Sequence, residues 1–366
     1  MIPARMVICA LLFLLAGTLA GFGQDNQEEP AGTQTIAIMT GGPDSSSLRM
    51  AADLQAVLDG ESDLRVLPVA GRGPVQTLLD LLELRGIDAA IIPADTLAYV
   101  KKAELQEDSD KKLVYLAKLA SEDIHVIAAP SINSLEELRG KRVNIGTASN
   151  ARFVTGSLLF SLLGIDIVPT EDDLVTALAD IQSGKTQAAV FVGRKPSPVI
   201  AALPGTAFKL LPIPQIHALQ GIYSPDFFSG DDYPALVAAE GSVDTLSVGV
   251  VLAALDWKKG TPRYGRLRPF VAALFANAAD LREGRRYADW AAANLAAEVP
   301  GWTRASVSQA WLDSEDAEAG RKQDTGEAAL KIEFETFLDA RGESETGGDR
   351  TSLFEEFIRW KNEGKK

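Results

Sequence analysis

A small polar turn near the start of the chain has the composition of an anion-binding site. An apolar run of strand length at residues 36–39 precedes it, and an apolar pattern of helical period follows it over residues 48–58. A strand, a small turn and a helix start leave free backbone N–H groups at the carboxyl end of a sheet, where a carboxylate can bind. Many α/β proteins use such turns only to reverse the chain. The candidate ligand contacts here are Thr40, Gly41, Gly42, Ser45 and Ser46.

The middle of the chain repeats this arrangement with a cation added. A strand expected at residues 141–146 ends in a polar turn, and a helix starts after it with Arg152 in its first turn. A guanidinium group can bind a carboxylate through two parallel hydrogen bonds. Alternatively, an arginine at a helix start is exposed or pairs with a neighbouring carboxylate. The candidates of this second turn are Thr147, Ser149, Asn150 and Arg152.

Three further charged residues occupy turns at strand ends and are secondary candidates. Arg72 follows the second expected strand, and Lys195 follows the strand expected near residues 188–192. Asp95 follows the third strand and could accept a hydrogen bond from a ligand amine or hydroxyl. The alternative interpretations are a helix cap for Asp95 and simple solvent exposure for Lys195.

The sequence offers no pattern of a known catalytic or metal site. It holds two histidines, His125 and His217, without a carboxylate at metal-binding spacing, and neither a G-x-S-x-G nor an H-E-x-x-H motif is present. The single cysteine, Cys9, lies in the apolar N-terminal segment. We therefore expect a protein that is not an enzyme and that binds no metal and no cofactor.

Composition and the N-terminal segment indicate export. Arg5 is the only charge before an apolar core, and small residues follow near position 20, which is typical of a cleaved signal peptide over residues 1–23. A net charge of −14 disfavours nucleic acid as a partner. We expect a periplasmic protein.

The order of expected elements indicates an α/β protein with two lobes. Strands and helices alternate from residue 34 to about residue 100, which favours parallel pairing with crossover helices. The segment 113–130 is expected to form two adjacent strands, and the lobes are expected to join at crossings near residues 128–131 and 219–224. The predicted division is lobe 1 at 24–128, lobe 2 at 129–222, a return to lobe 1 with packing helices at 223–313, and a charged helical extension at 314–366.

Several segments together resemble the TAXI-type solute receptors of tripartite ATP-independent periplasmic (TRAP) transporters. The turn MTGGPDS at 39–45 is similar to the family's glycine-rich first turn, and AGRG at 70–73 is a loose match to its second. The segments DAAIIPAD at 88–95 and LEELRGKRVNIG at 135–146 match two further landmarks. AAVFVGRKPSP, VDTLSVGVVL and the stretch up to residue 313 are also similar. The first turn lacks the family's aromatic residue, and Arg72 stands where a small residue is usual.

The resemblance implies a type II-like solute-binding fold and a role in transport. The protein would close two lobes on a small organic anion or an amino acid and deliver it to TRAP membrane permease subunits. Two alternatives share the same fold: the receptor of another importer or a sensor system, and an envelope interaction protein that has lost ligand binding.

Overall fold

The computed structural model describes residues 34–59, 63–282, 290 and 292–314. The predicted signal peptide, the leader and the C-terminal extension lie outside these ranges. Within them, no helix is long and apolar enough to cross a membrane.

Three parallel strands and two crossover helices build the first lobe, as the sequence predicted. The strands lie in the order β2-β1-β3. Alternate residues of β1 face opposite layers: Ile36 and Ile38 pack with α1, whereas Met39 packs with α2. The elements are β1 (Gln34–Met39), α1 (Ser46–Leu58), β2 (Leu64–Val69), α2 (Pro74–Glu83), β3 (Ala89–Pro93), α3 (Asp95–Lys102) and α4 (Ser109–Lys112).

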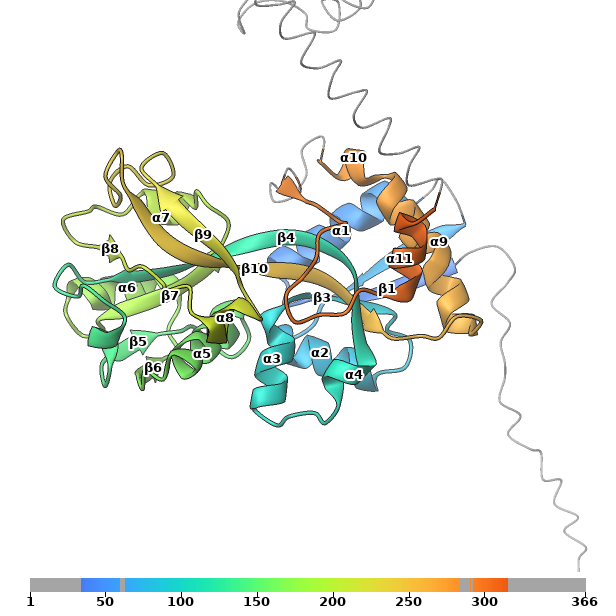
Figure 1. Ribbon diagram of the computed structural model, residues 1–366, viewed down its shortest axis with the longest axis horizontal. Helices are drawn as coiled ribbons and strands as arrows, with labels where there is room; N and C mark the ends of the chain where they lie inside the picture. Colours follow the sequence, from blue (N-terminus) through green and yellow to red (C-terminus); the bar gives the residue numbers. More distant parts are fainter. Residues whose placement is uncertain (1–33, 60–62, 283–289, 291, 315–366) are drawn as a thin grey trace, which may run out of the picture. The chain divides into compact units, whose positions relative to one another are not determined.

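Two long strands run through both lobes. β4 (Leu113–Ala128) and β10 (Ser242–Leu255) pair antiparallel over most of their lengths (Figure 1). β10 pairs with β3 through residues 250–253, whereas β4 pairs with β7 through residues 123–128. The prediction of two adjacent strands at 113–130 is wrong, because bulges absorb the irregular pattern within one strand. β10 pairs with β3 of the first lobe and with β9 of the second. The crossings predicted at 128–131 and 219–224 stay predictions.

The second lobe repeats the parallel plan. β7, β5 and β6 continue the ten-stranded sheet, while β8 pairs with β4 and β9 with β10. Phe228 of β9 packs with Tyr233 in a core that belongs to this lobe. The elements are η1 (Glu136–Leu138), β5 (Arg142–Asn144), α5 (Ala151–Leu163), β6 (Val168–Thr170), α6 (Leu174–Gln182), β7 (Ala188–Gly193), α7 (Pro198–Ala201), β8 (Lys209–Leu210), α8 (His217–Gln220) and β9 (Ser224–Ser229).

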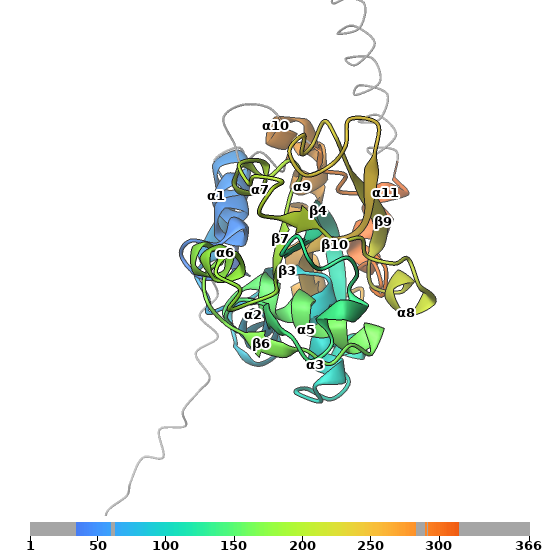
Figure 2. The same ribbon diagram turned by 90° about the vertical axis from the view of Figure 1, so that its left-hand side faces the viewer.

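The last described elements are the helices α9 (Pro262–Ala276), α10 (Ala278–Arg282) and α11 (Ser306–Leu312). α9 and α11 pack together (Figures 1 and 2), with the rings of Phe275 and Trp311 stacked 4.8 Å apart. Packing helices were predicted within residues 223–313, but the described residues 293–302 contain no helix. Pro300 lacks a backbone donor, and Gly301 has a φ of 75°, so the chain turns there.

One buried apolar cluster contains residues of both lobes. It joins Leu81 and Leu97 of the first lobe to Ile145 and Leu159 of the second. At its edge, Tyr99 of α3 meets Phe153 of α5 edge-on, with ring centroids 6.0 Å apart. The lobes are therefore in contact through α2, α3 and α5. The α/β class and the two-lobed plan expected from the sequence are confirmed, and the predicted domain boundaries stay predictions.

The close packing of α5 on β5 generates a stability prediction. A Cβ at Gly156 would lie 2.8 Å from Cγ2 of Ile145, whereas a Cβ at Gly265, an exposed position of α9, would meet nothing within 4 Å. We expect Gly156→Ala to lower the free energy of unfolding by about 1–3 kcal/mol. Gly265→Ala, the matched control, should raise it by up to about 1 kcal/mol through helix propensity. Urea unfolding measures both, and equal effects at the two sites would contradict this packing argument.

Candidate ligand-binding site

A cavity of about 640 Å³ lies where the turns of both lobes meet. This volume is within the range of small-molecule sites. Apolar side chains of three strands form part of its wall, namely Ile91, Ile92, Pro93, Val192 and Val250. The polar part comes from the starts of α1 and α5 and from the turn before α2. Eight of the twelve predicted contacts line it: Gly41, Gly42, Ser45, Ser46, Arg72, Ser149, Asn150 and Arg152.

The serine run caps α1 and leaves two amides open toward the cavity wall. Oγ of Ser45 accepts a hydrogen bond from N of Leu48 (3.2 Å), and Oγ of Ser47 accepts one from N of Gly41 (2.8 Å). Among the described residues, no acceptor is found for the backbone N–H groups of Ser46 and Ser47. These N–H groups at the positive end of a 13-residue helix attract an anion.

The start of α5 has the same construction in the second lobe. Oδ1 of Asn150 accepts from N of Phe153 (3.3 Å) as the N-cap. The N–H groups of Ala151 and Arg152 precede that capped amide, and within the described ranges neither has an acceptor. Two helix N-termini, one from each lobe, therefore line the same cavity.

The Arg152 side chain is held in place but not neutralised. Nε donates to O of Val190 (2.8 Å), and Nη2 donates to Oδ1 of Asn144. Burial lowers the pKa of the Arg152 guanidinium and the Asp173 carboxylate opposes this effect, but no ion pair of Arg152 occurs in the part of the chain described. An arginine keeps its charge even so. Nη1 has no hydrogen-bond acceptor in the described protein, which leaves it available to a ligand.

Arg72 brings a second cation to the cavity from the first lobe. Its side chain is exposed and forms no ion pair or hydrogen bond with the described residues. The neighbouring Gly73 is in close approach to the other lobe, because a Cβ there would lie 2.7 Å from the carbonyl oxygen of Ser149. Its φ of 123° also favours glycine. Arg72 and Arg152 thus face one cavity from opposite lobes.

Glu122 is a cavity residue that sequence reasoning missed. It lies on β4, is 6 % exposed, and accepts a hydrogen bond from Oγ of Ser46 (3.4 Å). The available signal was a Glu–Asp pair in a largely apolar segment, residues 113–130, for which we predicted two adjacent strands. Glu122 gives the site an acceptor for a ligand amine or hydroxyl.

Three predicted contacts lie away from the cavity wall. Thr40 is buried, and its hydroxyl donates to O of Val69 (3.1 Å). Thr147 is exposed and is 2.8 Å from Oγ of Ser149, so it supports the second turn. Asp95 is fully buried between the lobes. Their roles as ligand contacts stay predictions.

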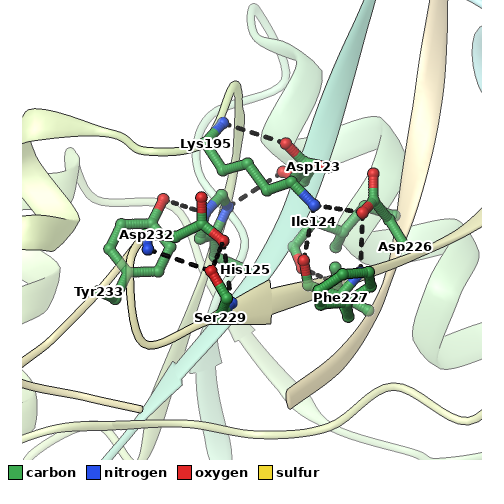
Figure 3. Close-up of polar contacts among 10 residues, drawn as sticks. Asp123, Ile124, His125, Lys195, Asp226, Phe227, Ser229, Asp232 and Tyr233 are labelled. Atoms are coloured by element: carbon green, nitrogen blue, oxygen red, sulfur yellow. Dashed lines mark hydrogen bonds and ion pairs between the residues drawn. The ribbon is translucent and has the colours of Figure 1, made fainter. Parts of the chain in front are cut away.

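Lys195, the fourth, belongs to a separate polar cluster (Figure 3). Its Nζ contacts the Asp226 carboxylate and donates to O of Phe227 (2.6 Å), while its backbone N donates to Oδ2 of Asp123 (3.0 Å). These bonds join the turn after β7 to β4 and β9. The ammonium group therefore has protein acceptors already.

His125 is a buried member of the same cluster (Figure 3). Nδ1 lies 3.1 Å from O of Asp123, and Nε2 lies 2.7 Å from Oη of Tyr233, which itself accepts from N of Ser197 (2.9 Å). Burial lowers the pKa of His125 to about 4. A neutral ring with the proton on Nδ1 satisfies every one of these bonds. The geometry is that of a core histidine.

The carboxyl of Asp123 generates a pH prediction. Burial, followed by the neighbouring Asp226 carboxylate, raises its pKa from 3.8 to about 7. The folded state then binds more protons than the unfolded state between these values, so this group lowers stability as the pH rises from about 4 to about 7. We expect Asp123→Asn to unfold at higher urea than the wild type at pH 8, with a smaller difference at pH 5.

An exposed carboxylate provides the control for this prediction. Glu171→Gln removes a negative charge at an exposed position of the same lobe and should leave the pH dependence of the wild type unchanged. A pH profile of Asp123→Asn that runs parallel to that of the wild type would contradict the assignment.

Comparison with known proteins gives structural similarities of low identity. No family model and no curated protein matches the chain. A periplasmic transporter structure shares 17 % identity over 80 % of this chain and 96 % of its own, with a TM-score of 0.44. A TctC solute-binding protein from Polaromonas shares 13 % identity over 77 % of this chain and 88 % of its own, with a TM-score of 0.41. The aliphatic sulphonate binding protein SsuA from Escherichia coli shares 18 % identity over 66 % of this chain and 67 % of its own, with a TM-score of 0.37.

Proposed function

We propose that the protein is an extracytoplasmic solute receptor that binds a small organic anion or an amino acid between its two lobes. The observation that carries this proposal is the cavity, in which two helix N-termini and two arginines from opposite lobes converge. Preorganised N–H donors and guanidinium groups bind a carboxylate. Glu122 would accept from an amine or hydroxyl of the same ligand.

Export and delivery to a membrane permease belong to the same proposal. The apolar segment at residues 1–23 supports a periplasmic location, and the motifs at 39–45, 88–95 and 135–146 support a divergent TAXI-type receptor of a TRAP transporter. The cavity itself is equally suited to a receptor of another importer or to a ligand sensor. Neighbouring genes for TRAP permease subunits would favour the first, and an ATPase or a sensor kinase would favour the others.

A thermal-shift screen tests the receptor function directly. Dicarboxylates, amino acids, keto acids and other small anions would be added singly to the purified protein. A ligand at 100 times its dissociation constant adds about 2.7 kcal/mol to the stability of the folded state. We expect at least one carboxylate-containing compound to raise the melting temperature. If no compound raises the melting temperature, the result favours the alternative of an envelope interaction protein that has lost ligand binding.

Arg152 is expected to be the main anchor of the ligand found in that screen. Arg152→Gln removes the charge and should weaken binding by about tenfold to a hundredfold, as is typical for a lost charge-assisted hydrogen bond. Arg72→Gln should weaken binding by less, up to about fivefold, because its side chain is exposed. Isothermal titration calorimetry measures both.

A matched arginine in the same lobe provides the control. Arg142 is exposed on β5 and does not line the cavity, so Arg142→Gln should bind as the wild type does. Because Arg152 also bonds to Val190 and Asn144, the melting temperature of each ligand-free variant is measured alongside. Unchanged affinity in a folded Arg152→Gln variant would overturn the anchoring role.

A further inference from the structure

The Asp95 carboxyl forms buried hydrogen bonds across the boundary between the lobes. Asp95 begins α3 in the first lobe and is 0 % exposed. Its Oδ2 accepts from Oγ1 of Thr155 on α5 (2.6 Å) and from Oη of Tyr223, which precedes β9 (3.1 Å). Thr155 and Tyr223 both lie in the second lobe. If the lobes separated, these two bonds would break and the carboxyl would meet water.

The other oxygen of this carboxyl is poorly accommodated. Oδ1 of Asp95 and the adjacent Oγ1 of Thr96 are buried with no hydrogen-bond partner in the described protein. A buried carboxylate with one unpartnered oxygen is costly in its charged form, and protonation removes that cost. Burial accordingly raises the pKa of Asp95 from 3.8 to about 6, against the opposing effect of the Thr155 and Tyr223 hydroxyls.

We propose that Asp95 is a proton-linked latch: contact between the lobes takes up a proton on this carboxyl, so that lobe closure is favoured as the pH falls. Coupling of the latch to ligand affinity rests on the proposed function, since a ligand held by both lobes binds only the closed form. The latch itself does not depend on the ligand.

Of Asp95 and its two hydrogen-bond partners, Asp95 is the group that titrates in this pH range. Thr155 from α5 does not ionise, and burial, followed by the Asp95 carboxylate, raises the pKa of Tyr223 well above its ordinary value. Lys118 on β4 is a cation of an adjoining strand: a Cβ at Gly249 would lie 3.5 Å from its Cε and 3.9 Å from Cβ of Ala94. Burial lowers the pKa of Lys118, and Lys118 is not among the causes that shift the pKa of Asp95. No charged side chain of α2 or α4 takes part in the hydrogen bonds of the Asp95 carboxyl.

The sign of the effect follows from the two pKa values. In the closed form the carboxyl titrates near 6, and in separated lobes it would titrate near its ordinary value of 3.8. Between these two values, closure of the lobes is accompanied by the uptake of a proton. Above about pH 6 the carboxyl is charged in both forms, so closure carries the full free-energy cost of burying the charge. The ratio of closed to open molecules should fall about tenfold between pH 5.0 and pH 7.5.

A ligand-free distance measurement tests the latch. The only cysteine is Cys9, so the full chain carrying Cys9→Ser accepts a pair of spin labels at Leu67→Cys in the first lobe and Val175→Cys in the second. Both positions are exposed, at 50 % and 77 %. Double electron–electron resonance then reports the closed and open populations at pH 5.0 and pH 7.5. We expect the closed population to decrease at the higher pH.

Three variants distinguish a latch from a merely structural contact. Asp95→Asn keeps the acceptor oxygen and should make the populations independent of pH. Tyr223→Phe removes a donor to the charged form, so the midpoint of the transition should move to higher pH. Asp123→Asn removes a second carboxyl whose pKa is raised, within the second lobe, and should respond as the wild type does.

Two results would overturn the proposal: distances in the wild type that do not change with pH, or the same change in Asp95→Asn. Failure of the receptor function is visible separately. If no compound binds in the screen but the distances still depend on pH, the result supports the latch and contradicts the receptor function.

Discussion

The antiparallel pairing of β4 with β10 is the constraint on which the other elements depend. The two strands place the three-stranded parallel sheet of the first lobe on one side and that of the second on the other. Parallel strands with crossover helices put their polar turns at the carboxyl ends of the strands. Because both lobes are attached to the same strand pair, the turns at Gly41 and at Ser149 face a common cavity.

The electrostatics of the cavity differ from those of the whole chain. The protein carries a net charge of −14, yet the cavity brings together two helix N-termini and the guanidinium groups of Arg72 and Arg152, alongside the carboxylates of Asp44 and Glu122. Screening confines the influence of distant surface carboxylates to about 10 Å at 0.1 M salt. The local donors therefore determine which ligand is attracted, and the acidic surface is compatible with an anionic one.

The candidate site was partly predictable because its contacts come from local turns. Ser45 and Asn150 were identified from the order strand, turn and helix, and each caps the helix that follows it. Glu122 was missed because nothing in a strand pattern shows which face meets a cavity. Lys195 was placed in the correct turn, but its acceptors, Asp123 and Asp226, come from β4 and β9. The sequence could not show that pairing.

Local sequence by itself determined the α/β class, the parallel pairing of the strands in the first lobe and the polar turns, because apolar periodicity and turn chemistry act over a few residues. Tertiary structure alone decided that residues 113–128 form one strand, that β9 exists, and that Asp95 is buried against Thr155 and Tyr223. These features depend on pairing and burial between segments far apart in the chain, as in the bond between Asp95 and Tyr223, which are 128 residues apart. A local pattern carries no information about such partners.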